Sequence, residues 1–166
     1  PLVPLYGLLG ETQPRLGAGI PYTVPRNTYR TGDGRWVAVS SSSESVAGRV
    51  MALIGLGDDE RFADFSGRVA HREEIDAHMA DWMAQRSTEQ VLAEFEAAHA
   101  AVAPVYDMAD IAADAHFADR GAIIDVDGIP MQEVVARLSA TPGRVRWAGR
   151  PLDADGDDLR AELTQE

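Results

Sequence analysis

The side chains of this sequence that could do chemistry are serines, histidines and carboxylates, because cysteine and lysine are both absent. Their absence excludes disulfides, thiolate catalysis, cysteine-ligated zinc, lysine Schiff bases and a P-loop lysine. The serines at 40–43 lack the G-x-S-x-G turn that exposes a nucleophile, and no histidine lies near them in the sequence. We therefore interpret them as a loop that ends in a helix N-cap.

The other chemically competent groups also favour structural interpretations. His71, Glu74 and His78 have the helical spacing of metal ligands, but we favour their interpretation as a solvated helix face. The acidic run 153–158 is similar to a calcium loop, yet its glycine is misplaced and no distal glutamate is in register, which favours a disordered tail. Adjacent carboxylates such as Glu73 and Glu74 point in different directions on a helix. The sequence shows no complete active site and no metal site.

Composition narrows the class of protein. A chain of 166 residues with 45% hydrophobic residues suits one compact domain or a piece of a larger one. It contains no apolar run near the ~18 residues that a membrane span needs. A net charge of -12 argues against nucleic acid as a partner. We expect a cytoplasmic protein, since the lack of cysteine fits a reducing compartment, and an initial proline suggests that the chain begins inside a longer or processed product.

The charges are unevenly distributed along the chain. Residues 12–32 and 134–152 contain no acidic residue, and the basic residues that they hold are all arginine: Arg15, Arg26, Arg30, Arg137, Arg144, Arg146 and Arg150. This split indicates that the two ends face a different environment from the acidic middle, such as another domain, a partner chain or an anionic ligand. Two weakly ordered arms are the alternative.

Local patterns predict a series of short elements. Residues 29–39 have two β-prone arms around Thr-Gly-Asp-Gly, which predicts a hairpin. A helix is expected from a serine cap at 42–43 to Gly55, and a longer one over 70–85 with a buried stripe of Ile75, Met79, Trp82 and Met83.

The second half of the sequence continues with alternating signals. A capping box at 87–90 opens another helix, and an edge strand over 101–105 follows it. Asp107 and Asp114 are predicted to cap two brief helices, and Asp127-Gly128 forms the turn of a second hairpin. The first 25 residues are rich in proline and glycine, which predicts an extended lead with little helix.

The order of these motifs resembles one enzyme family. It runs from residues 24–39 (VPRNTYRTGDGRWVAV) through DERF at 59–62 and RVAHREEID at 68–76 to Trp82, Thr88, APVYD at 103–107 and TPG at 141–143. This order resembles the class III CoA-transferases, the CaiB/BaiF family, and the resemblance extends from about Gly19 to Leu152. No single motif is decisive, so the resemblance depends on their order and spacing.

The resemblance implies an α+β fold. In that family a small domain with β-hairpins and several helices is inserted between the two parts of a Rossmann-like large domain. This chain is similar to the C-terminal half, with an extended arm over 1–25, the small domain over 26–136, and a return segment with an acidic tail over 137–166. Both arms would contact the missing large domain, and the implied assembly is an interlocked homodimer or heteromer.

The resemblance also implies a reaction. An aspartate of the N-terminal half would attack an acyl-CoA thioester, and CoA, bound mainly by that half, would pass to a carboxylic acid. A racemase of α-methylacyl-CoA thioesters and a non-catalytic scaffold or partner subunit remain alternatives. As part of a CoA-transferase, we expect this chain to be inactive alone, with coenzyme A as a substrate and no covalently bound cofactor.

One active-site feature is implied within the chain. Formyl-CoA transferase-like members carry a glycine-rich loop that covers the thioester intermediate, and Gly17, Ala18, Gly19, Ile20 and Pro21 occupy the matching place. A plain linker is the alternative, because the polyglycine pattern and its following glutamine are missing. The residues expected to contact an anion or the partner are Arg26, Arg30, Arg144, Arg146 and Arg150.

Overall fold

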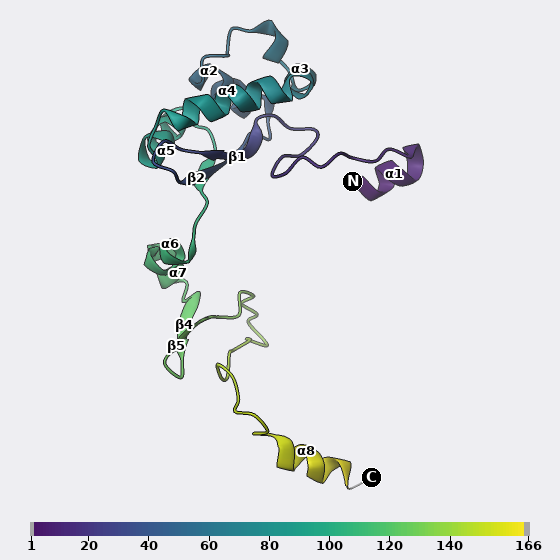
Figure 1. Ribbon diagram of the computed structural model, residues 1–166, viewed down its shortest axis with the longest axis vertical. Helices are drawn as coiled ribbons and strands as arrows, with labels where there is room; N and C mark the ends of the chain where they lie inside the picture. The colour runs from purple at the N-terminus through teal and green to yellow at the C-terminus, as the bar shows by residue number, and fades with distance from the viewer. Residues whose placement is uncertain (1, 165–166) are drawn as a thin grey trace. The chain divides into compact units, whose positions relative to one another are not determined.

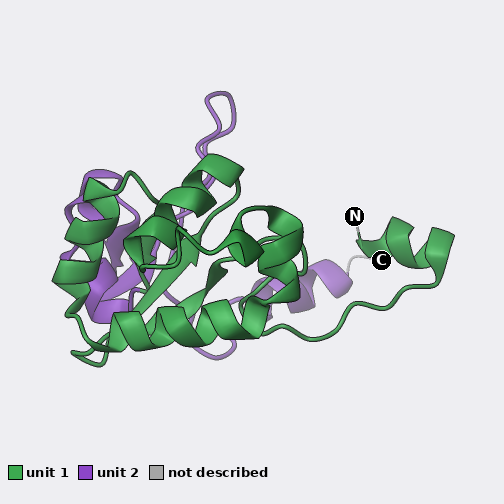
Figure 2. Ribbon diagram, turned by 90° about the horizontal axis from the view of Figure 1, so that it is seen from above, with its two compact units in different colours: residues 1–105 green, residues 106–166 purple. Residues whose placement is uncertain are grey.

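The computed structural model describes residues 2–164, which belong to two compact units, residues 1–105 and 106–166 (Figure 2). We describe each unit by itself. The division falls at 105/106, whereas the boundaries expected from the sequence lie at 25/26 and 136/137, and these remain predictions about the family's domains.

Unit 1 is built around a three-stranded antiparallel sheet. The strands β1 (Arg26–Arg30), β2 (Trp36–Ser40) and β3 (Val102–Pro104) follow one another in that order, with Tyr29 opposite Val37. The predicted hairpin is confirmed, and Gly34 supplies the positive φ of +84° that its turn requires. Strand β3 lies at the edge of the sheet. Its proline has no amide hydrogen to donate, and an edge strand tolerates that loss.

Four α-helices and one 3-10 turn follow the first hairpin within unit 1. They are α2 (Glu44–Leu53), η1 (Glu60–Phe62), α3 (Phe65–Ala70), α4 (Arg72–Ala84) and α5 (Thr88–Ala97). The Ser43 hydroxyl caps α2 and the predicted Ser87–Gln90 capping box opens α5, so both local predictions are confirmed. The predicted helix over 70–85 corresponds to α4, and the short helix α3 ends just before it at Ala70.

The core of unit 1 lies between one face of the sheet and the helices. Tyr29, Val37 and Val39 share that face by their pairing and alternation, and all three are buried. The helix α4 crosses the sheet beside β1 (Figure 1) and buries Ile75, Met79, Trp82 and Met83, as predicted. The opposite face is open, since Trp36 is 49% exposed.

One buried charge fixes the segment that precedes β1. Arg68 of α3 is 1% exposed and donates to the carbonyl oxygens of Val24 at 3.1 Å and Phe62 at 2.9 Å. It also forms an ion pair with Glu44, whose side chain is half exposed. All three contacts satisfy the guanidinium inside the core, which is the condition for burying such a group.

The N-terminal lead differs from the prediction. Residues Leu2–Leu9 form the helix α1, where an extended segment with little helix was expected. Pro4 lies in the first turn of α1, where a proline costs no hydrogen bond, and the apolar residues that follow supply helix propensity. None of the side chains of α1 is buried, and Val3 and Leu8 are more than four-fifths exposed.

Unit 2 contains three short helices and a hairpin. They are α6 (Met108–Ala113), α7 (Ala115–Asp119), β4 (Ile123–Val126), β5 (Ile129–Gln132) and α8 (Gly156–Leu163). Asp107 and Asp114 cap α6 and α7, and the hairpin turns at Asp127-Gly128 with positive φ at both residues, as predicted.

The acidic tail is a second correction, because α8 replaces the expected disorder. Arg160 binds Asp153 and Asp157 at 2.9 Å each, so a basic side chain of the helix offsets part of its acidic charge. Among the described residues of unit 2, no apolar side chain is buried. Unit 2 therefore lacks the hydrophobic core that stabilises unit 1.

Candidate functional site

The predicted glycine loop is an ordered turn held against the helix α4 of the same unit. The amide of Gly19 donates to the carbonyl of Leu16 at 3.0 Å, and Ile20 forms an isolated bridge with Thr23. Arg72 at the start of α4 donates from Nη2 to the Ile20 carbonyl oxygen at 2.6 Å. The loop is thus joined to a helix 52 residues later in the chain.

A polar cluster lies beside this contact, between β1 and α4. The Asp76 carboxylate accepts from the Tyr29 hydroxyl at 2.6 Å and from the Asn27 amide at 3.3 Å. Burial, and then the hydrogen bond to Asp76, raise the pKa of Tyr29 above its ordinary value. The phenol therefore stays protonated and acts as a fixed donor.

A second cluster joins the hairpin turn to α5. The Asp33 carboxylate accepts from the Thr31 hydroxyl at 2.5 Å and from the Thr88 amide at 2.9 Å. These hydrogen bonds, that of Thr31 first, lower the pKa of Asp33 to about 2. Asp33 holds two elements together and has no exposed base or nucleophile beside it in this cluster.

Two of the predicted arginines lie on the open face of the sheet. Arg26 and Arg30 are four residues apart on β1, so their side chains leave the sheet on the same side as Trp36, which pairs with Arg30. Arg30 donates from Nε to the Gly34 carbonyl at 3.3 Å and remains exposed. This face offers positive charge and an aromatic surface to a partner or an anion.

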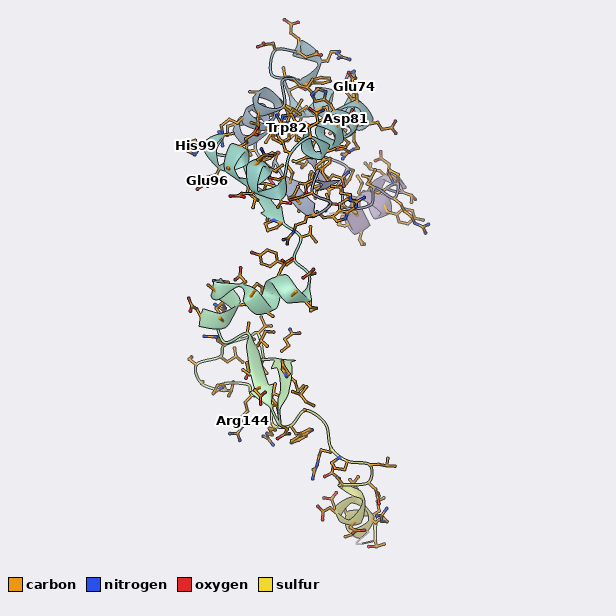
Figure 3. All side chains as sticks on the ribbon, turned by 60° about the vertical axis from the view of Figure 1, so that its left-hand side comes forward. Glu74, Asp81, Trp82, Glu96, His99 and Arg144 are labelled. Atoms are coloured by element: carbon orange, nitrogen blue, oxygen red, sulfur yellow. The ribbon has the colours of Figure 1, made fainter. Side chains whose placement is uncertain are left out.

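The other three predicted arginines belong to unit 2. Within residues 2–164, no hydrogen bond or ion pair engages the side chains of Arg144 and Arg146, and Figure 3 labels the first of them. Arg150 forms an ion pair with Asp155 and lies 5.6 Å from the Trp147 ring centre. Arg150 therefore already has an acidic partner within its own unit.

Unit 2 also contains a cavity of about 580 Å³. Apolar side chains of α6, α7 and the segment after β5 line it, with Met108, Phe117 and Val134 among them, and Arg120 and Arg137 lie at its wall. Because Met108 is 75% exposed, the apolar lining of this cavity is open to solvent.

The remaining chemically competent residues are engaged in structure. The rings of His71 and His78 contact the backbone carbonyl oxygens of Gly67 and Ile54, both at 2.8 Å. Glu74 pairs with Arg61 and, like Asp81 and Glu96, lies on the exposed surface of α4 and α5 (Figure 3). No group of histidines and carboxylates suited to a metal ion occurs among the described residues. None of the helices in residues 2–164 has the length and hydropathy of a membrane span.

The comparison with known families decides what these features belong to. The model of CoA-transferase family III matches residues 3–156. The chain belongs to this family.

Relatives named as CoA-transferases match nearly the whole length of this chain. The succinyl-CoA–D-citramalate CoA-transferase of Chloroflexus aurantiacus is 31% identical over 98% of this chain and 42% of its own length. The alpha subunit of the succinyl-CoA–L-malate CoA-transferase of the same organism is 33% identical over 98% and 40%. A succinyl-CoA:mesaconate CoA-transferase of Haloarcula hispanica is 32% identical over 97% and 41%. The chain spans about two-fifths of the length of these relatives.

Solved structures agree with the family assignment. A CaiB/BaiF family protein from Brucella suis superposes with a TM-score of 0.76 at 29% identity, over 98% of this chain and 43% of its own. Rv3272 from Mycobacterium tuberculosis, at 21% identity and a TM-score of 0.62, supports the fold alone. The α+β fold of CoA-transferase family III that the sequence suggested is thereby confirmed.

Sequence reasoning missed two arginines that organise this region. Arg68 and Arg72 lie four residues apart in a charged, helical stretch, where the pattern indicates solvent-facing side chains. Both instead reach the segment before β1, through the carbonyls of Val24 and Ile20. No local pattern indicates these contacts, because they join residues 44 and 52 positions apart in the sequence.

Proposed function

We propose that this chain is the small-domain portion of a CoA-transferase that moves CoA between an acyl-CoA thioester and a carboxylic acid. The observation that carries the proposal is the family match over nearly the whole chain, which corresponds to about two-fifths of relatives named as CoA-transferases. Because those relatives use succinyl-CoA by name, we propose a succinyl-CoA donor and a dicarboxylic acceptor.

The nucleophilic aspartate is assigned to a large-domain portion outside this chain. Support comes from the clusters in residues 2–164, where Asp33 and Asp76 are bound to neighbouring donors and His71 and His78 contact backbone carbonyls. CoA is likewise assigned mainly to the large domain, because a chain with a net charge of -12 is a poor host for a polyanion.

This chain would supply one wall of the site and the surfaces that bind the large domain. The loop at 17–21 would cover the reacting thioester. The partner surfaces would be the exposed apolar α1, the open sheet face with Arg26 and Arg30, and the coreless unit 2 with Arg144, Arg146 and Arg150. Apolar area left uncovered on α1 and unit 2 is the kind that association buries. The alpha and beta subunits among the relatives make a heteromer as plausible an assembly as an interlocked homodimer.

Reconstitution tests the proposal. This chain is mixed with the large-domain portion of the same family protein, succinyl-CoA and a C4 or C5 dicarboxylic acid, and the new acyl-CoA is measured by chromatography. We expect CoA transfer from the mixture and none from either portion alone. No transfer by the mixture would contradict the proposal, and deuterium exchange at the α-carbon without an acceptor acid would instead support a racemase.

A further inference from the structure

Arg72 is an arginine that faces backbone instead of an acid. Its Nη2 donates to the Ile20 carbonyl oxygen at 2.6 Å, whereas its Nη1 is buried and has no hydrogen-bond partner in the described protein. Within residues 2–164 no carboxylate forms an ion pair with it. In a chain with 27 acidic and 15 basic residues, such a site needs an explanation.

The nearest candidate counter-ion on the same helix is engaged elsewhere. Asp76 lies one turn after Arg72 on α4, but its oxygens accept from Tyr29 at 2.6 Å and Asn27 at 3.3 Å. Arg72 is therefore directed toward the loop before β1, and the loop carbonyl is its sole acceptor among the described residues.

Gly19 allows the loop to approach this guanidinium. A Cβ at position 19 would lie 3.3 Å from Nη1 of Arg72, 3.2 Å from the Leu16 oxygen and 3.4 Å from the Arg26 oxygen. The Leu16 oxygen is a backbone atom that cannot rotate away, so a Cβ here would require the loop or the Arg72 guanidinium to shift by a few tenths of an ångström. Glycine and arginine therefore form a matched contact between residues 19–20 and α4.

A comparison with Arg68 shows which end of the segment is loose. Arg68 holds Val24 with a guanidinium bound on all sides, and Thr23 to Pro25 are buried. Arg72 holds Ile20 by one hydrogen bond and leaves a buried nitrogen unsatisfied. Opening is easiest where few bonds must break, so the loop would move at residues 17–21 and stay fixed at 23–25.

We propose that Arg72 is a positioning residue that holds the 17–21 loop closed on α4. This inference rests on the proposed function in one respect, namely that the closed loop covers the reacting thioester. Transfer passes CoA from the donor acyl group to the acceptor carboxylate. Hydrolysis instead adds water to the thioester and releases the acid and free CoA. A loosened loop would admit water to the thioester and would therefore favour hydrolysis.

Hydrogen exchange on the 166-residue chain tests the contact itself. Arg72→Met removes the donors at similar length, Arg72→Lys restores one donor, and Arg61→Met is the control because Arg61 lies exposed between Asp59 and Glu74. We expect Arg72→Met to speed exchange of the Gly19 amide about tenfold, Arg72→Lys to recover part of it, and Arg61→Met to change nothing there. The α5 amides should be unaffected.

A second variant keeps the test decisive if Arg72→Met does not fold. Gly19→Ala leaves Arg72 in place and displaces the loop from the other side, so it should also speed exchange at residues 16–22. Unchanged exchange there in the folded variants would overturn the proposed contact.

Turnover in the reconstituted enzyme tests the functional part. Arg72→Met should raise the ratio of succinyl-CoA hydrolysis to CoA transfer about tenfold with the KM for succinyl-CoA unchanged, and Arg72→Lys should partly restore it. A fast-exchanging loop with an unchanged ratio would overturn the positioning role. Lack of transfer by the unmodified mixture would contradict the proposed function, while the exchange result would still decide the Arg72 contact.

Discussion

Several charged residues of unit 1 anchor the backbone and the first hairpin turn. Arg68 and Arg72 donate to carbonyls before β1, and the Asp33 carboxylate accepts from Thr31 in the hairpin turn and from the Thr88 amide at the start of α5. The contacts of Arg68, Arg72 and the Thr88 amide join residues 44 to 55 positions apart, whereas the Thr31 contact lies within the turn. These charged side chains therefore stabilise the fold, although their residue types would also suit a catalytic role.

Asp33 makes stability depend on pH in a predictable direction. Its pKa is about 2 in the folded protein against an ordinary 3.8, so its contribution is complete above about pH 5 and is lost as the pH falls from 4 to 2. Asp33→Asn removes this contribution. We expect the melting temperature of the variant to lie below that of the unmodified chain at pH 6, and the gap to close toward pH 2.

The matched control is Asp58→Asn, since Asp58 is exposed and no hydrogen bond or ion pair engages it within residues 2–164. That variant should show no gap at any pH. A gap for Asp33→Asn that is as wide at pH 2 as at pH 6 would contradict the assigned role.

The junction of the first hairpin with α4 and α5 is a close approach between elements of unit 1. The Gly32 amide donates to the Arg86 carbonyl at 2.7 Å, and a Cβ at position 32 would lie 2.6 Å from the Ala84 oxygen. Gly32→Ala must therefore move the turn or the end of α4. We expect it to lower the free energy of unfolding by about 1–3 kcal/mol in urea denaturation.

Gly48→Ala is the companion variant, because Gly48 lies inside α2 with no atom near its Cβ position. It should raise stability by roughly 0.5–1 kcal/mol through helix propensity. Equal effects of the two substitutions would show that close approach does not set the need for glycine at position 32.

Elements with strong local signals could be predicted from the sequence. The turn at 31–35, the Ser43 and Ser87 caps and the Asp127-Gly128 turn each specify their own backbone within a few residues. The helices α1 and α8 could not be predicted. The prolines around α1 and the acidic residues around α8 suggested an absence of regular structure. The contacts of Arg68 and Arg72 span 44 and 52 residues, which local patterns do not encode.

At the scale of the molecule, the two units differ in what stabilises them. Unit 1 has a core that joins the sheet to α2, α4 and α5, while no described apolar side chain of unit 2 is buried. The family match covers both units, yet the chain amounts to about two-fifths of its relatives. Under the proposed function, unit 2 and α1 would gain their buried surface from the large-domain portion.

The central claim is that the reacting carboxylate lies outside this chain, and trapping the covalent intermediate tests it most directly. Hydroxylamine converts an aspartyl-CoA thioester into a hydroxamate that stays on the aspartate. After incubation of both portions with succinyl-CoA and hydroxylamine, intact mass spectrometry should find this 17.9 kDa chain unmodified and the hydroxamate on the large-domain portion. A hydroxamate on any carboxylate of this chain would contradict the account.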